Sequence, residues 1–226
     1  PHQSSVIDIT NPAITVDLGQ CIQCTRCVRA CRETQVNDVI GISNRGSNLK
    51  ITFDLDATLG ESSCVSCGEC VQACPTNALT STGAATNLPD TKKIDTVCPY
   101  CGVGCLLTFN VSDGAIKSAT GRNGPANKNR LCVKGRYGFD YVHHEDRLTK
   151  PLIRIKGMKK TAALIHKKEI SDYFREASWS EALEFAATGL KSILDIHGGN
   201  SLAGLGSAKG SNEEAYAFQK FIRSAL

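Results

Sequence analysis

The sequence lacks a long apolar run, a strong charge of either sign and any visible targeting segment. A membrane-spanning helix needs roughly 18 or more consecutive apolar residues, and no stretch approaches that length, so we expect no membrane span. The formal net charge is only +4, from 26 basic and 22 acidic residues. This mild charge does not favour nucleic acid or a membrane surface as a partner. The chain begins at Pro1 rather than Met, so its start says little about targeting.

Cysteine, in contrast, is abundant, with 12 among 226 residues. An even number allows a disulfide scaffold of the kind that small secreted proteins use. The cysteines instead fall into three tight groups of four, separated by long stretches without cysteine. Such quartets suit metal ligation, which requires reduced thiolates. We therefore expect metal centres rather than disulfides, and a cytoplasmic protein.

The first two quartets repeat one spacing, C-x2-C-x2-C-x3-C, which is that of two-cluster [4Fe–4S] ferredoxins. Three thiolates placed two residues apart can bind three corners of one cubane. The fourth lies at the start of a helix, points away and serves the other cluster. We expect one cluster to be bound by Cys21, Cys24, Cys27 and Cys74, and the other by Cys64, Cys67, Cys70 and Cys31. The alternative is structural zinc, which favours paired C-x2-C knuckles around a loop.

The third quartet joins three closely spaced cysteines to a distant one, and its members are Cys98, Cys101, Cys105 and Cys132. Its spacing offers four soft ligands to one further cluster, with zinc as the alternative. Gly102 and Gly104 would let backbone N–H groups approach the sulfur atoms, which helps to set a reduction potential.

The pattern along the chain divides it into three regions, residues 1–90, 91–147 and 148–226. Between the first two quartets, Val39–Ile42 and Leu49–Leu55 alternate like strands around a turn at residues 44–46. The small, polar stretch Ser81–Asp90 is typical of a linker. It separates the region of the first two quartets from that of the third.

The last region contains two helix starts of the S-x-x-E type, at Ser178 and Ser211. An apolar face follows the first, and Gly198–Gly199 ends that helix. Residues 201–206 are typical of a short buried strand. Helix, strand and helix predict the opening of an α/β domain larger than this chain contains.

Several motifs together resemble one enzyme family. They are VCPYCGVGC around the third quartet, LCVKGR at Cys132, DRLTKPLIR at 146–154, SWSEAL at 178–183 and GSAKGSNEEAYAFQKFIR at 206–223. The set closely resembles the molybdenum or tungsten bis-pterin oxidoreductases. A two-cluster ferredoxin module in front looks like the alpha subunit of NAD-dependent formate dehydrogenases.

This resemblance implies an α+β chain. It would comprise a two-cluster ferredoxin-like module, a small [4Fe–4S] domain and the truncated beginning of an α/β molybdopterin-binding domain. It also implies three [4Fe–4S] clusters and a molybdenum or tungsten bis-molybdopterin guanine dinucleotide. Formate would be oxidised to carbon dioxide, and NAD-reducing flavin and iron–sulfur subunits would be the partners. The family's metal ligand lies beyond Leu226, so we expect no catalytic ligand here and interpret the chain as a piece of the large subunit.

Three further residues become candidates through the resemblance. The family places the lysine of LCVKGR, here Lys134, between cluster and pterin, where it would relay electrons; the alternative is a surface lysine. Gly206 and Lys209 lie where the expected strand meets the expected helix, a position suited to cofactor phosphate. Because the quartets are complete, His143 and His144 are interpreted as structural or surface residues.

Other functions share parts of this pattern. A stand-alone polyferredoxin would explain the cysteines but not the capped helices after residue 176. Another enzyme with the same iron–sulfur domain, such as a nitrate reductase, would differ at the metal ligand. An iron-only hydrogenase also carries a double ferredoxin module, but CPYCGVGC favours the pterin family.

Overall fold

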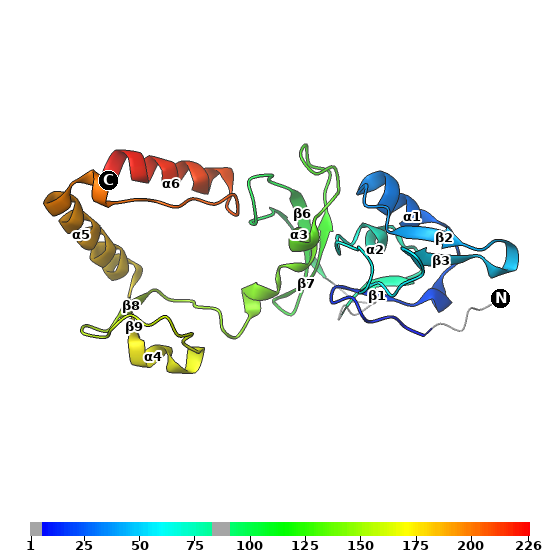
Figure 1. Ribbon diagram of the computed structural model, residues 1–226, viewed down its shortest axis with the longest axis horizontal. Coiled ribbons are helices and arrows are strands. Elements are labelled where there is room, and N and C mark those ends of the chain that lie inside the picture. The colour runs from blue at the N-terminus through cyan, green and yellow to red at the C-terminus, as the bar shows by residue number, and fades with distance from the viewer. Residues whose placement is uncertain (1–5, 83–90) are drawn as a thin grey trace. The chain divides into compact units, whose positions relative to one another are not determined.

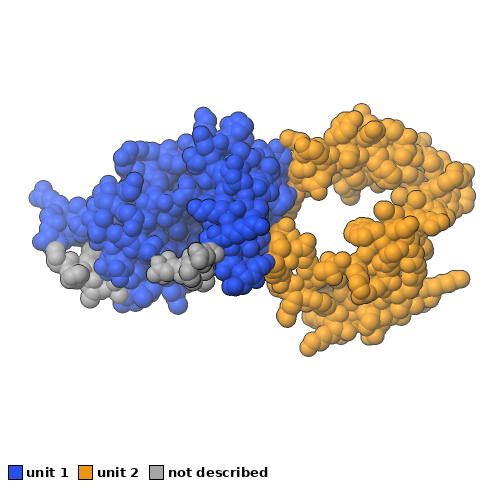
Figure 2. Space-filling view, turned by 180° about the vertical axis from the view of Figure 1, so that it is seen from behind, with its two compact units in different colours: residues 1–140 blue, residues 141–226 orange. Residues whose placement is uncertain are grey.

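Short antiparallel sheets and short helices make up most of the structure. The computed structural model describes residues 6–82 and 91–226, coloured along the chain in Figure 1. The chain divides into two compact units, residues 1–140 and 141–226 (Figure 2). Within the described residues, each sheet has two or three antiparallel strands. The prediction of a mixed α+β chain is therefore confirmed.

Two strand pairs frame the first two quartets in unit 1. Strand β1 (Ile14–Val16) pairs with β4 (Leu79–Ser81), and β2 (Ile40–Ser43) forms the expected hairpin with β3 (Lys50–Phe53). A 3-10 turn at Gly46–Asn48 joins the hairpin strands, and another at Leu18–Gln20 follows β1. The core between these strands is a single cluster that contains Ile14, Val16, Val28, Ile40, Ile51, Phe53, Leu59 and Leu79 together with buried cysteines.

Each of these quartets carries one short helix. Helix α1 (Arg26–Arg29) continues into a π-helical turn at Ala30–Thr34, and α2 comprises Glu69–Ala73. Both helices begin after a residue in the left-handed conformation, Thr25 and Gly68 respectively. The helices therefore start inside the cysteine motifs.

The region of the third quartet, also in unit 1, is built on a three-stranded sheet. Strands β5 (Lys92–Val97), β6 (Leu106–Ser112) and β7 (Ala115–Gly121) follow one another as an antiparallel meander, with a bulge at Asn110/Val111. Helix α3 (Val133–Tyr137) begins directly after Cys132. A small core of Cys98, Leu107 and Leu131 joins the sheet to the segment that leads into α3.

Unit 2 contains the two long helices of the chain. A two-stranded sheet, β8 (Leu152–Arg154) with β9 (Phe174–Glu176), lies next to α4 (Ile170–Tyr173). Helices α5 (Trp179–His197) and α6 (Asn212–Ala225) follow, and both have the N-caps that the sequence predicts. Further 3-10 turns lie at Asp140–His143, Lys167–Glu169 and Gly199–Ser201. No residue of α5 or α6 is buried.

Some local predictions are wrong. The fourth cysteine of each ferredoxin-type quartet lies at the end of a helix rather than at its start, since Cys31 is in the π-helical turn after α1 and Cys74 directly follows α2. The expected buried strand at 201–206 is an exposed segment whose first residue ends a 3-10 turn, and Leu205 is 96% exposed. No strand of the described residues pairs with it, and an apolar sequence forms a strand only where a partner accepts its hydrogen bonds. The expected linker begins too early, because Ser81 belongs to β4; residues 83–90 of it lie outside the described part of the chain.

Membrane insertion can be assessed for the described helices. In residues 6–82 and 91–226, none has both the length and the apolar character that crossing a bilayer requires.

Candidate metal centres

The two ferredoxin-type loops share one backbone conformation. In the first, Gln23 and Thr25 have positive φ angles of 58° and 59°; in the second, Ser66 and Gly68 occupy the matching positions at 53° and 75°. Left-handed backbone is unfavourable for residues other than glycine and is typical of functional sites. The sequence repeat is therefore also a structural repeat.

This conformation turns backbone donors toward sulfur. The N–H of Gln23 donates to Cys21 Sγ at 3.3 Å, and the N–H of Ser66 donates to Cys64 Sγ, also at 3.3 Å. Hydrogen bonds to a thiolate stabilise its charged form. In both loops, a backbone N–H group thus contacts the sulfur of the first cysteine.

The cysteine that ends the second quartet lies with the first quartet. Cys74, directly after α2, lines the same cavity as Cys21, Cys24 and Cys27. Burial, together with the charges of Cys21, Cys74 and Cys24, raises the pKa of the Cys27 thiol to about 11. The structure thus brings together the four cysteines that the sequence assigns to one cluster.

The reciprocal group forms around Cys70. Burial raises the pKa of this thiol well above its usual range, and neighbouring charges on Cys67, Cys64, Cys27 and Cys31 add to the rise. Cys64 also lies near Cys31, whose charge raises its pKa after the larger effect of burial. The fourth cysteine of the first quartet therefore lies close to Cys64 and Cys70 of the second.

Cys74 differs from the neighbouring thiols because its pKa is lowered. Burial acts to raise its pKa, but hydrogen bonds from the backbone of Thr76, Leu79 and Ala78 and from the Thr76 hydroxyl together lower it. These donors come from the turn before β4 and from the strand itself. Strand β4 and the turn before it therefore favour the ionised thiolate of Cys74.

The third quartet is assembled on the edge of the meander and the start of α3. Cys98 N–H donates to the carbonyl of Cys105 at 2.8 Å, which closes the loop between β5 and β6. Burial raises the pKa of Cys105, and the charges of Cys98, Cys101 and Cys132 raise it further. All four thiols of the quartet therefore lie close enough to influence one another.

Gly104 acts differently from the prediction. Gly104 has a φ of 68°, and its N–H lies 3.4 Å from the carbonyl oxygen of Cys101. A carbonyl, and not a sulfur, is thus the acceptor that the structure gives to this N–H group. The glycine serves to turn the loop between Cys101 and Cys105.

The donor chemistry of the three groups fits iron–sulfur clusters. Each group gathers four thiols, several with raised pKa values, and ligation by metal replaces their protons and offsets their mutual repulsion. Among residues 6–82 and 91–226, no three His, Cys, Asp or Glu side chains are arranged to hold a single metal ion. A cubane needs a wider arrangement, because each of its irons binds a different thiolate.

Sequence reasoning missed a buried ion pair between two quartets. Arg136 of α3 and Glu69 of α2 are only 4% and 6% exposed, and their NH2 and Oε1 atoms lie 2.5 Å apart. Glu69 stands between two cysteines of the second quartet, and Arg136 ends the LCVKGR motif. The sequence shows a charged residue at each of these positions. It does not indicate that two residues 67 positions apart form a pair.

The remaining candidates lie at exposed positions. Lys134 is exposed in α3, and its carbonyl accepts the N–H of Gly138 at 2.8 Å. Gly206 and Lys209 are exposed in the segment before α6, and Lys209 N–H donates to Ser207 Oγ at 3.2 Å. Lys134 belongs to unit 1 and the other two to unit 2. His143 and His144 are also exposed.

Three family models match successive parts of the chain. A 4Fe-4S dicluster domain matches residues 20–78, a molybdopterin oxidoreductase Fe4S4 domain matches 91–144, and a molybdopterin oxidoreductase domain matches 147–226. The chain belongs to the molybdopterin oxidoreductases. The resemblance that the cysteine motifs indicate is therefore confirmed.

Curated relatives of this molybdopterin oxidoreductase chain include proteins of Staphylococcus and Bacillus species. A putative formate dehydrogenase of Staphylococcus haemolyticus is 34% identical over 95% of the chain and 24% of its own length. A probable oxidoreductase of Bacillus subtilis is 34% identical over the whole chain and 26% of its own length. A putative formate dehydrogenase of Staphylococcus aureus is 33% identical over 95% of the chain. The chain thus spans about a quarter of the length of these relatives.

Proposed function

We propose that this chain is the electron-transfer portion of a formate dehydrogenase. It would pass electrons from a molybdopterin centre through three [4Fe–4S] clusters toward an NAD-reducing partner. The observation that carries the proposal is the gathering of twelve cysteines into three groups of four in unit 1. The names of two relatives support formate as the substrate of the complete protein.

The cross-paired cysteines define the first two proposed centres. One is bound by Cys21, Cys24, Cys27 and Cys74, the other by Cys64, Cys67, Cys70 and Cys31. The third is bound by Cys98, Cys101, Cys105 and Cys132. When bound, such clusters take up and release single electrons at potentials that depend on hydrogen bonds to sulfur and on exposure. The protein's part is to hold the thiolates and supply those hydrogen bonds.

The pterin side of the proposal concerns three exposed residues. Lys134, in the helix that follows Cys132, is proposed to stand between the third cluster and a bis-molybdopterin guanine dinucleotide of molybdenum or tungsten. Gly206 and Lys209 are proposed to contact the cofactor's phosphates. The match of residues 147–226 to a molybdopterin oxidoreductase domain supports this cofactor over a stand-alone polyferredoxin. NAD-reducing flavin and iron–sulfur subunits, and a cytoplasmic location, belong to the same proposal.

An electron count tests the proposal on this chain. After anaerobic reconstitution, a reductive titration followed by paramagnetic resonance is expected to show about three electrons taken up per chain, one for each quartet of cysteines. The complete protein is then mixed rapidly with formate, and its cluster signals are followed. Uptake of three electrons with reduction by formate supports the proposal. Cluster signals that respond to nitrate but not to formate would favour the nitrate reductase alternative.

A further inference from the structure

A buried salt bridge joins the second quartet to the third within unit 1. The guanidinium of Arg136 and the carboxylate of Glu69 lie 2.5 Å apart, with side chains that are 5% and 7% exposed. Removing two charges from water costs several kcal/mol per ion, so such a pair contributes little net stability. It does restrict geometry, because separating the two groups would leave each buried charge without its partner. We therefore expect the pair to act by fixing the positions of the two segments that it joins.

The guanidinium uses all three of its nitrogen atoms on the second quartet's helix and loop. Nε donates to the carbonyl of Cys67 at 2.7 Å, NH1 donates to Gln72 Oε1 at 2.9 Å, and NH2 donates to Glu69. The side chain crosses the loop at Gly68, where an added Cβ would lie 2.1 Å from Arg136 Cδ. A planar fork with fixed directions holds such a set of acceptors in a single geometry.

The same residues hold the start of α3 beside the third quartet. Arg136 N–H donates to the carbonyl of Cys132 at 3.1 Å, and Glu69 Oε1 accepts the N–H of Leu131 at 3.2 Å. From the first quartet's side, Gln35 Nε2 donates to the carbonyl of Leu131 at 3.0 Å. A continuous set of bonds thus runs from the backbone of Cys67, through Arg136, to the backbone of Cys132.

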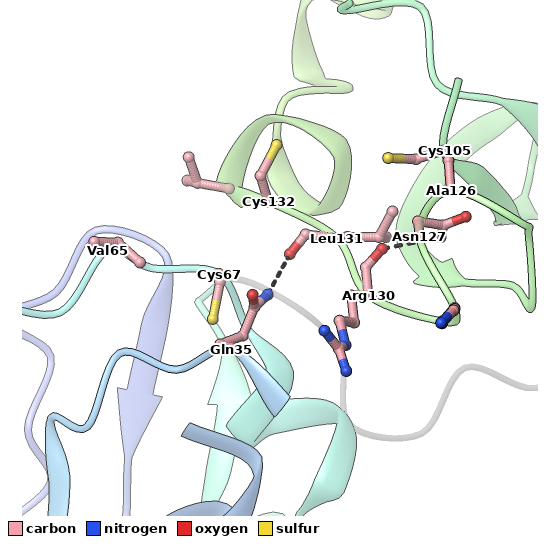
Figure 3. A pocket seen from close by; sticks show the side chains of 11 residues that line it. Gln35, Val65, Cys67, Cys105, Ala126, Asn127, Arg130, Leu131 and Cys132 are labelled. Carbon is pink, nitrogen blue, oxygen red and sulfur yellow. Dashed lines mark hydrogen bonds between the residues drawn. The ribbon is translucent and has the colours of Figure 1, made fainter. Parts of the chain in front are cut away.

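Cys67 and Cys132 line one cavity of about 360 Å³, seen in Figure 3. In that view the Sγ atoms of Cys105 and Cys132 are turned toward the same space, while Cys67 Sγ points away from it. One cysteine of the second quartet and two of the third thus line the same cavity.

We propose that Arg136 is the positioning residue for electron transfer between the second and third centres. It fixes their separation by fastening the Cys67 loop to the helix after Cys132. The proposal rests on the proposed function, since it requires both centres to hold clusters. One electron lost by one cluster is gained by the other, and no proton or ligand moves.

The pair unites one positive and one negative side chain, so it adds no formal net charge between the two quartets. Geometry, not net charge, is therefore what the pair supplies. A variant that keeps the positive charge but loses the planar geometry of the guanidinium separates the contribution of charge from that of geometry.

The test compares Arg136→Lys with the unmodified chain after reconstitution. Lysine keeps the positive charge beside Glu69 but cannot make three directed bonds. Arg122→Lys is the matched control, because Arg122 pairs with the exposed Asp95 at 3.2 Å within the third region. Iron content, reduction potentials and the magnetic interaction between reduced clusters are measured for each. That interaction depends on separation and orientation, which a change in stability alone would not alter.

We expect Arg136→Lys to retain all clusters and their potentials but to lose the magnetic interaction between two of them, with slower exchange of electrons. The control keeps its iron content, its reduction potentials and the magnetic interaction. The double variant Glu69→Gln/Arg136→Gln, which leaves no unpaired charge, should show the same loss. An unchanged interaction in these cluster-replete variants would overturn the inference, as would loss of the clusters themselves, since positioning does not require the ligands to change. If the unmodified chain shows fewer than three clusters, the proposed function itself fails.

Discussion

The side-chain amide of Asn127 makes two hydrogen bonds to the backbone of Leu106, as a residue of a neighbouring strand would. Its Oδ1 accepts the N–H of Leu106 at 3.0 Å, and its Nδ2 donates to the Leu106 carbonyl, also at 3.0 Å. The same Nδ2 donates to the carbonyls of Arg122 and Arg130. Leu106 follows Cys105, and Arg130 lies just before Cys132. One buried amide therefore holds both ends of the long spacer in the third quartet.

Asn127→Ala is expected to damage the third centre selectively. The substitution removes the hydrogen bonds of Asn127 to the Leu106 N–H and to the Arg130 carbonyl, at a cost of about 1–3 kcal/mol for each buried group left unpaired. Iron per reconstituted chain should fall from about twelve to about eight, because one four-iron cluster is lost. Asn110→Ala is the matched control, since Asn110 makes a single side-chain bond to Ser118 Oγ in the same sheet. Full iron content in the Asn127 variant would contradict this account.

Cys74→Ser is expected to damage the centre of the first quartet. Cys74 shares a cavity with Cys21, Cys24 and Cys27, although its sequence neighbours belong to the second quartet. Cys31→Ser should in turn damage the centre of Cys64, Cys67 and Cys70. Paramagnetic resonance of the two variants distinguishes the centres by their signals. Loss of the same signal in both variants would show that each quartet binds its own cluster.

Gly68→Ala should destabilise unit 1 more than Gly114→Ala. Both glycines have left-handed backbone, with φ angles of 75° and 72°, which costs an alanine roughly 1–2 kcal/mol. Only at Gly68 would the new Cβ also collide, with Arg136 Cδ at 2.1 Å; at Gly114 nothing lies within 4 Å. Denaturant unfolding of the reconstituted variants measures the difference. Equal losses at the two sites would mean that Arg136 moves aside without cost.

Lys134→Ala is expected to leave folding and cluster content unchanged, because the side chain is exposed. In the complete protein, it should slow the reduction of the third cluster by formate. Lys134→Arg should restore this rate only in part, since a planar guanidinium does not replace a compact ammonium. Lys117→Ala, at an exposed position of β7, is the control. An unchanged rapid-reaction rate in Lys134→Ala would make this an ordinary surface lysine.

Local signals predicted the elements that depend on neighbouring residues. The hairpin of β2 and β3 follows from alternation around a turn, and the N-caps at Ser178 and Ser211 follow from S-x-x-E. In α6 the capping box is complete, with Glu214 bonded back to Ser211 N–H at 2.6 Å. In α5 the corresponding Glu181 bonds Arg175 instead. Short-range rules thus identified where the helices begin.

Short-range sequence rules could not predict the contacts between segments that are distant in the sequence. The strand expected at 201–206 depends on a partner strand, which no periodicity within six residues can reveal. The pairing of Glu69 with Arg136 requires two motifs to meet across 67 residues, and nothing in either motif specifies the other. The grouping of Cys74 with Cys27 was accessible because the ferredoxin spacing carries a three-dimensional rule with it.

The central claim is that three cysteine quartets bind three clusters, and chemical analysis of the reconstituted chain tests it most directly. Iron and labile sulfide are measured per chain, with zinc measured in the same samples. The account predicts about twelve iron and about twelve sulfide, because each cubane with four cysteine ligands contains four of each. Iron near eight, or one equivalent of zinc retained by the quartet that ends at Cys132, would contradict it.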